Sequence, residues 1–129
     1  MNTTFISHIA LHVQHLEKST NFYQDVIGLP SIPEPFKIGK HSWFAIGSNC
    51  QLHLIAGAGA GMIHDINNHI SFSTNQFDSF IHKLRAQGIM FFNALKQENV
   101  VENRPDGVLQ VFFQDPDGYW LEMNNEFKD

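Results

Sequence analysis

Four side chains of metal-ligand type stand at matched places in this sequence: His8, His53, His69 and Glu122. Each lies in a short segment where apolar residues alternate with others, the pattern of a β-strand with one buried face. Within its segment, each of the four falls on the face opposite the most apolar positions. Two histidines with one carboxylate suit zinc, nickel, cobalt, manganese or iron(II), with zinc or nickel first, and leave coordination positions open. The sequence therefore predicts a divalent metal site able to support catalysis.

The alternative is that these histidines are structural, because a chain with eight histidines places some of them on strands by chance. A single such histidine is more often exposed or hydrogen bonded than bound to metal. Four ligand-type residues at symmetric positions favour the metal, with His8, His69 and Glu122 as its core. His53 is predicted as a ligand and as a catalytic residue beside Glu122, and whether it is a ligand or a free acid–base group stays open.

The other histidines are expected at the surface or behind the ligands: His12, His15, His41, His64 and His82. His8 and His12 have the spacing of two zinc ligands on a helix. On a strand, however, four residues span about 13 Å, too far for both side chains to bind one ion. His12 is therefore available to face a substrate instead.

Two similar series of elements must position these residues. In the first half, alternation and helical periodicity predict a strand, a helix ended by Gly28, and two further strands, over 7–13, 16–27, 41–47 and 51–55. A short strand near Phe36 to Ile38 could precede the last two.

The second half repeats this order. A strand at 69–72 precedes a helix whose buried stripe is Phe77, Phe80, Ile81 and Leu84. Gly88 ends that helix, and Asn75 with Asp78 forms a candidate N-cap pair. Turn-forming Pro, Asp and Gly residues then introduce strands at 108–114 and 119–124.

The repeat indicates an internal duplication. His8 and His69 lie 61 residues apart, and Gly28 and Gly88 lie 60 apart. The Gly and Ala residues at 57–61 form a natural linker between module one, about 1–56, and module two, about 62–129. Neither half is long enough for an independent core, so residues 1–129 are expected to form one domain or to exchange halves with a second chain.

Composition disfavours several classes of partner and of metal site. The 129 residues are 43% hydrophobic, and a net charge of −5 is spread without blocks of like charge. This disfavours nucleic acid or an anionic membrane as partner. The first residues show no signal peptide or membrane anchor, so a cytoplasmic location is expected. Cys50 is the only cysteine, which leaves neither an intrachain disulfide nor a cysteine zinc cluster.

The sequence resembles the vicinal oxygen chelate superfamily, which includes glyoxalase I, fosfomycin-resistance enzymes, extradiol dioxygenases and bleomycin resistance proteins. The resemblance is carried by HIALHV, EKSTNFYQDVIGL, QLHLI, HISFST and DPDGYWLEM, at 8–13, 17–29, 51–55, 69–74 and 115–123. It implies an α+β fold of two βαβββ modules in tandem, forming a curved, U-shaped mixed sheet around a metal site, with helices on the outer face. It also implies ligands at His8, His53, His69 and Glu122, a small-molecule substrate and a homodimer.

Within this superfamily, the resemblance to glyoxalase-like lyases leads. Glyoxalase I has a glutamate where this chain has His53, so one ligand position differs. An isomerisation of the glyoxalase type would require Glu122 to act as the base. His53 could remain a ligand or share the proton transfer.

Other activities of the superfamily fit less well. Extradiol dioxygenases match His8, His69 and Glu122 and place a catalytic histidine near His53, but they also use a tyrosine where this chain has Phe112, which lacks a hydroxyl. Fosfomycin thiol transferases carry a threonine where this chain has Ala10. Bleomycin-binding relatives bind without a metal, so a non-catalytic binding protein is the remaining class.

The expected inner surface indicates an aromatic rather than a charged environment for the substrate. The expected inner surface has aromatic residues, Trp43, Phe112 and Trp120, and few charged ones. Arg104 and Lys37 could meet an anionic group, although a solvated surface position is the simpler expectation for both.

Overall fold

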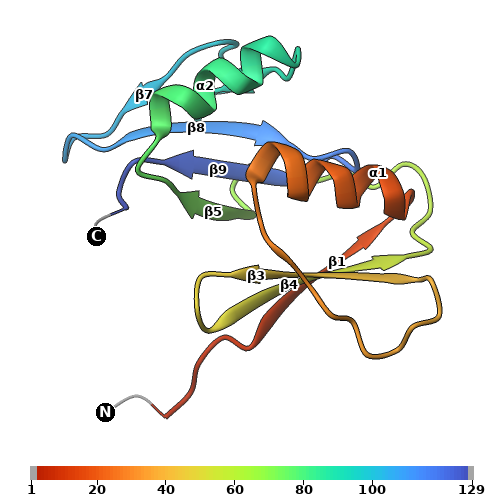
Figure 1. Ribbon diagram of the computed structural model, residues 1–129. Coiled ribbons are helices and arrows are strands. Elements are labelled where there is room, and N and C mark those ends of the chain that lie inside the picture. The colour runs from red at the N-terminus through yellow and green to blue at the C-terminus, as the bar shows by residue number, and fades with distance from the viewer. Residues whose placement is uncertain (1–2, 128–129) are drawn as a thin grey trace. The chain divides into compact units, whose positions relative to one another are not determined.

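The computed structural model describes residues 3–127, and the chain divides into two compact units, residues 1–62 and 63–129. Each unit contains its own β-sheet and helix (Figure 1). The division follows the predicted Gly and Ala linker at 57–61 by one residue. That the two modules form one domain stays a prediction.

The first unit is a four-stranded mixed sheet with one helical segment. Its elements are β1 (His8–Val13), α1 (Leu16–Asn21), η1 (Phe22–Ile27), β2 (Ser31–Ile32), β3 (His41–Ile46) and β4 (Cys50–Ala56). The strand order is β1-β4-β3-β2, with β1 parallel to β4 and the other pairs antiparallel. The central strand β4 therefore has neighbours on both sides, while β1 is at an edge.

The predicted helix at 16–27 is confirmed, although its second half is a π-helix. It ends at Gly28, whose φ of 86° is left-handed, a conformation that glycine adopts without a steric penalty. The backbone N–H groups of Gly28 and Leu29 both donate to the Tyr23 carbonyl, at 3.1 and 3.0 Å. These bonds close the helix where the sequence predicted its end.

The two faces of this sheet differ as strand alternation predicted. Val13, Phe44, Leu52 and Leu54 on one face are fully or almost fully buried together with Tyr23 from the helical segment. The strand register places His8, Trp43 and His53 on the opposite face. The apolar side chains thus bury one face against the helix, which leaves the polar and aromatic face for the candidate site.

The second unit repeats this topology with one additional short strand. Its elements are β5 (His69–Ser73), α2 (Phe77–Ala86), β6 (Phe91–Phe92), β7 (Glu102–Asn103), β8 (Leu109–Gln114) and β9 (Trp120–Asn124). The order is β5-β9-β8-β6, and β7 also pairs with β8. As in the first unit, the first and last strands are parallel neighbours. The α+β class and the paired βαβββ-like modules are therefore confirmed.

The predicted apolar stripe of α2 packs on this second sheet. Leu84 and Phe113 have no exposed surface, and the rings of Phe80 and Phe113 lie 5.4 Å apart, centroid to centroid. Figure 1 shows α2 along one face of β8 and β9. Glu122 of β9 lies on the opposite face, beside Ser71 of β5 in register.

Two local predictions were wrong. Residues 36–38 are not a strand: the short strand lies earlier, at Ser31–Ile32, where it pairs with β3. The carboxylate of Glu34 instead accepts hydrogen bonds from the backbone N–H groups of Phe36 and Lys37, which curls the segment into a loop. The helix α2 begins after Gln76 without a side-chain cap, so Asn75 and Asp78 do not form the predicted pair.

None of the helices within residues 3–127 combines the length and the apolar character that crossing a bilayer requires.

Candidate functional site

The four predicted ligands occupy matched positions in the two sheets. His8 begins β1 and His69 begins β5. His53 lies opposite Ala10, two residues after the first histidine, and Glu122 lies opposite Ser71, two residues after the second. The duplication inferred from sequence spacing thus extends to strand register, and each module contributes one pair.

The pair in the second module converges edge to edge. His69 Nε2 lies 3.3 Å from Glu122 Oε1. Phe112, opposite Glu122 in register, packs edge-on against the His69 ring at 5.1 Å between centroids. Glu122 is buried, with 7% of its surface exposed, so its carboxylate depends on these neighbours rather than on water.

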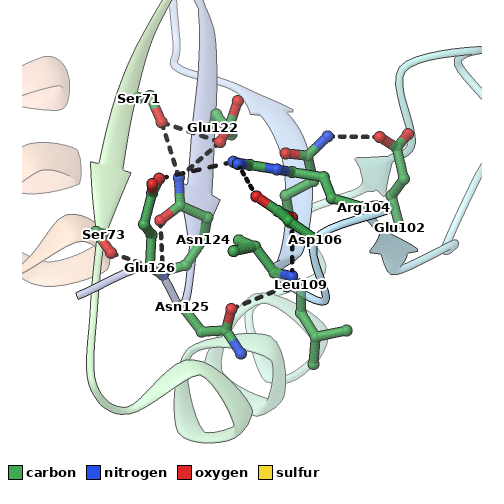
Figure 2. A network of polar contacts seen from close by, with 12 residues as sticks. Ser71, Ser73, Glu102, Arg104, Asp106, Leu109, Glu122, Asn124, Asn125 and Glu126 are labelled. Carbon is green, nitrogen blue, oxygen red and sulfur yellow. Dashed lines mark hydrogen bonds and ion pairs between the residues drawn. The ribbon is translucent and has the colours of Figure 1, made fainter. Parts of the chain in front are cut away.

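Hydrogen bonds to neighbouring residues orient the side chains of both His69 and Glu122, as Figure 2 shows for Glu122. His69 Nδ1 lies 2.7 Å from the Ile66 carbonyl oxygen, which can only accept, so Nδ1 carries a proton. Glu122 Oε2 accepts from Ser71 Oγ at 3.0 Å and from Asn124 Nδ2 at 2.7 Å. The atoms that remain for a further partner are His69 Nε2 and Glu122 Oε1.

This arrangement fits a cation between the two side chains. With its proton on Nδ1, a neutral His69 presents an Nε2 lone pair to the lone pairs of Oε1, and a proton or a metal ion would relieve their repulsion. Two ligand atoms held tetrahedrally at about 2.1 Å from one zinc ion lie about 3.4 Å apart, close to the 3.3 Å observed. Ligating histidines also commonly donate their second ring N–H to a carbonyl, as His69 does.

The pair in the first module is arranged differently, because its rings stack face to face. The rings of His8 and His53 lie 4.2 Å apart between centroids, with planes 15° apart. Trp43, opposite His53 on β3, stacks on His53 at 3.8 Å with planes 2° apart. Since β4 lies between β1 and β3, His53 is the middle ring of the three.

Stacking limits what these two histidines can bind jointly. A ligating nitrogen directs its lone pair within the plane of its ring. Two nearly parallel planes about 4 Å apart cannot both contain one ion about 2.1 Å from each nitrogen. His53 Nε2 also has a partner, Gln51 Oε1 at 2.9 Å. One ring would have to turn before His8 and His53 could share a metal.

The stacked rings border a cavity of about 720 Å³ within the first unit. Its walls include His8, Phe36, His41, Trp43, Gln51 and His53. Among the described residues that line it, none is an aspartate, glutamate, lysine or arginine. The cavity is therefore aromatic and polar without a fixed charge.

The surroundings of His53 disfavour its charged form. Burial lowers its pKa below the usual value, and repulsion from His8 and then His41 lowers it further. His53 is 8% exposed. The neutral ring can act as a stacking surface or as a hydrogen-bond partner in the cavity.

Arg104 lies at the surface and is paired with two acidic side chains of its own module. Its guanidinium contacts Asp106 Oδ2 at 2.5 Å and Glu126 Oε2 at 3.6 Å (Figure 2). The hydrogen bond to Asp106 raises the pKa of Arg104, and Glu126 and Glu122 contribute at longer range. The spacing of Arg104 and Asp106 around a turn was visible in the sequence, but the approach of Arg104 to Glu126 was not.

The remaining histidines and aromatic residues surround the two pairs. His41, expected at the surface or behind the ligands, lines the cavity. His64 Nε2 and Trp43 Nε1 are buried without a hydrogen-bond partner within residues 3–127. Phe112 and Trp120 form a small apolar cluster with Ile66, which supports the loop that holds His69.

No group of three or more His, Cys, Asp and Glu side chains lies close enough to hold a metal ion within the part of the chain that the structure describes. Each module brings together two of the four predicted ligands. The four-residue site stays a prediction.

Comparisons with known proteins agree with this architecture. A curated relative, "Glyoxylase I 4" of Arabidopsis thaliana, is 28% identical over 131 residues, covering 97% of this chain and 72% of the relative. Two solved structures share the fold. The first is "Oxidase ChaP-H2", with a TM-score of 0.80, 21% identity and coverage of 98% and 96% of the two chains. The second is a putative glyoxalase family protein from Bacillus anthracis, with a TM-score of 0.74, 24% identity and coverage of 97% of each chain.

The family model described as the Glyoxalase/Bleomycin resistance protein/Dioxygenase superfamily matches residues 5–123, nearly the whole chain. The chain belongs to this superfamily.

Proposed function

We propose that this protein is a metal-dependent enzyme of the glyoxalase-like lyase or isomerase type, acting on a small substrate through two adjacent oxygen atoms. The observation that carries the proposal is the His69–Glu122 pair, with Nε2 and Oε1 at 3.3 Å. The other polar atoms of the pair are hydrogen bonded to Ile66, Ser71 and Asn124. Membership of the superfamily and the relative called "Glyoxylase I 4" support the same class.

His8, His69 and Glu122 would hold one divalent ion, with zinc or nickel preferred. When bound, the ion supplies a Lewis acid that stabilises negative charge developing on a substrate oxygen. Imidazole and carboxylate ligands suit these metals. A curved, U-shaped arrangement of the two sheets around the ion, a homodimer and a cytoplasmic location are the accompanying predictions.

The chain's own residues would provide orientation and proton transfer. Ile66 holds the His69 ring in one tautomer, and Ser71 with Asn124 holds Glu122 Oε2. Oε2 already accepts two hydrogen bonds, so Oε1 is the oxygen that would take a proton from substrate, and Glu122 would have to leave or loosen from the ion to act as this base. His53 is the second candidate for proton transfer, because it lines the cavity of the first module.

The first test is metal binding. Protein freed of metal with EDTA should bind about one zinc or nickel ion per chain, measured by calorimetry. His69→Ala and Glu122→Gln should each weaken binding by at least about 100-fold, more than loss of a supporting residue costs. His82→Ala is the matched control, because His82 is an exposed histidine of α2. The proposal fails if the wild-type protein binds no ion, or if both variants bind as it does.

The second test is turnover. With zinc, nickel or cobalt, the protein should isomerise hemithioacetals of small 2-oxoaldehydes to 2-hydroxy thioesters, the adjacent carbonyl taking up the transferred hydrogen. Glu122→Gln should abolish this while its circular dichroism spectrum stays that of the wild type. Metal-loaded protein without such activity would contradict the lyase. Thiol transfer to an epoxide would instead indicate the thiol transferase alternative.

A ring-cleaving dioxygenase is the second candidate, favoured by the His8–His53 stack. In the stack His53 does not converge with His8 on one point, which suits a cavity histidine that is not a ligand. Phe112 weighs against it, because this residue has no hydroxyl to offer beside Glu122. Iron-dependent oxygen uptake with catechols would identify this activity. Stoichiometric drug binding without metal would indicate a non-catalytic resistance protein.

A further inference from the structure

Stacked aromatic rings line part of the cavity of the first module. Trp43, His53 and His8 form a continuous stack across β3, β4 and β1. His53 is covered on both faces by its neighbours, so only Trp43 and His8, at the ends of the stack, have a face turned away from it. Phe36 stands edge-on to Trp43, with ring centroids 6.1 Å apart and planes 81° apart.

Phe36 belongs to a loop, not to the sheet. Its side chain is 58% exposed although it lines the cavity, and it also packs against His41 at 4.8 Å between centroids. The carboxylate of Glu34 accepts from the Phe36 backbone N–H at 2.6 Å, which holds the loop in this form. A flat group entering beside Trp43 would therefore meet an aromatic face and an aromatic edge.

The polar atoms of the cavity are neutral hydrogen-bonding groups. Gln51 and His41 line it alongside Ser7 and Asn49. Without an arginine or lysine among the described lining residues, the cavity offers no fixed partner to a carboxylate, sulfonate or phosphate. Hydroxyl and carbonyl oxygens, by contrast, find both donors and acceptors there.

We propose that this cavity binds a neutral, planar, oxygen-bearing ring, which stacks on the outer face of Trp43 beside Phe36. Within the proposed function, such a ring is the part of the substrate that this cavity holds, in place of a charged thiol peptide. That the ring belongs to a substrate rests on the proposed function, whereas binding of the ring requires no metal. The volume of about 720 Å³ accommodates a fused two-ring molecule.

The test uses metal-free protein and matched probes. Naphthol is neutral and planar, decahydronaphthol is neutral and puckered, and naphthalenesulfonate is planar and anionic. Calorimetry should find naphthol binding about 3- to 10-fold more tightly than either comparator, as expected for one aromatic stacking contact. A cavity that is merely apolar would prefer decahydronaphthol, the more apolar molecule of the first two, and that result would overturn the proposal. Tighter binding of the sulfonate, or no measurable naphthol binding, would overturn it as well.

Two substitutions of Trp43 separate stacking from other roles. Trp43→Leu removes the ring and should weaken naphthol binding about 10-fold, whereas Trp43→Phe keeps a ring and should bind within about threefold of the wild type. Phe36→Leu should weaken binding, while Phe5→Leu, a change at an exposed aromatic residue outside the cavity lining, should not. Unchanged binding in both Trp43→Leu and Phe36→Leu would locate the ligand elsewhere and refute the proposal.

A measurement on the unmodified protein covers the case in which Trp43→Leu does not fold. Naphthol should shift the imidazole proton resonances of His41 through its ring current and leave those of His82 in place. Shifts at His82 alone would refute the assignment. If naphthol binds but no metal does, the proposed enzyme fails while this inference stands. If metal-loaded protein instead prefers S-hexylglutathione to naphthol, the inference fails and the lyase stands.

Discussion

His69 Nε2 and Glu122 Oε1 face each other at 3.3 Å. His69 Nδ1 donates a hydrogen bond to the Ile66 carbonyl, and Glu122 Oε2 accepts hydrogen bonds from Ser71 and Asn124. The supporting residues should therefore matter for metal affinity although none of them is a proposed ligand. The stack in the first module gives His8 and His53 a different relationship, with faces instead of edges in contact. These two geometries lead to separate predictions.

Removing a donor to Glu122 should weaken metal binding. Ser71→Ala frees Oε2 from one of its two hydrogen bonds and should lower zinc affinity by about 10–100-fold, measured by competition with a chelator. Ser73→Ala is the matched control on the same strand, because Ser73 Oγ donates to the Asn124 carbonyl at 3.4 Å and not to the carboxylate. Equal affinities in the two variants would contradict the supporting role of Ser71.

The tautomer of His69 should be visible directly. Because the Ile66 carbonyl can only accept, the nitrogen spectrum of metal-free protein should show Nδ1 of His69 with a bound proton. A long-range proton–nitrogen correlation spectrum would report it, with the assignment checked by the loss of its signals in His69→Ala. An unprotonated Nδ1 would mean that the hydrogen bond to Ile66 does not form, and the fit to a cation would lose its basis.

Phenylalanine substitutions should separate the two stacked histidines. His8→Phe and His53→Phe both keep an aromatic ring in the stack, so neither loses the packing. If His8 is the ligand of this pair, His8→Phe should weaken zinc binding by about 100-fold while His53→Phe stays within about threefold. The reverse order would make His53 the ligand and would require its bond to Gln51 to break.

The stability of the metal-free protein should depend on pH through His53. Burial, then repulsion from His8 and His41, lowers the pKa of His53 in the folded protein, whereas the unfolded chain titrates near the usual value of about 6.5. Between the lowered pKa of folded His53 and about pH 6.5, the unfolded chain therefore binds more protons than the folded protein. The free energy of unfolding should increase as the pH rises through this range, and this stabilisation should be lost as the pH falls through it.

Urea titrations at several pH values would measure this slope, and His53→Phe should flatten it. A histidine proton resonance of His53 that titrates above the usual range would contradict the sign of the effect.

Gly28 should be required for its backbone conformation. At a φ of 86°, Gly28→Ala should cost about 1–2 kcal/mol in free energy of unfolding, although a methyl group there would meet no atom within 4 Å. Gly59→Ala is the control, because Gly59 also has open space around it but no positive φ. Equal stability of the two variants would show that the helix end tolerates another conformation.

Local patterns in the sequence were sufficient for the elements and for the face on which each ligand-type residue lies. Alternation along a strand and the position of Gly28 depend on neighbouring residues, so β1, β4, β5, β9 and the end of the first helix were predictable. The spacing of His8 and His69 revealed the duplication for the same reason. The loop at Phe36 and the start of α2 were not predicted, because one carboxylate at Glu34 and an uncapped helix start decided them.

Only the tertiary structure decided how the side chains within each module meet. Strand alternation places His8 and His53 on one face, but whether their rings converge or stack depends on Trp43, from a strand whose register the sequence does not specify. The same holds for Glu122, whose hydrogen-bond partners come from two strands, and for Arg104, whose approach to Glu126 joins residues far apart in the chain. Residue type and strand face follow from local chemistry, whereas the geometry of a site follows from packing between distant segments.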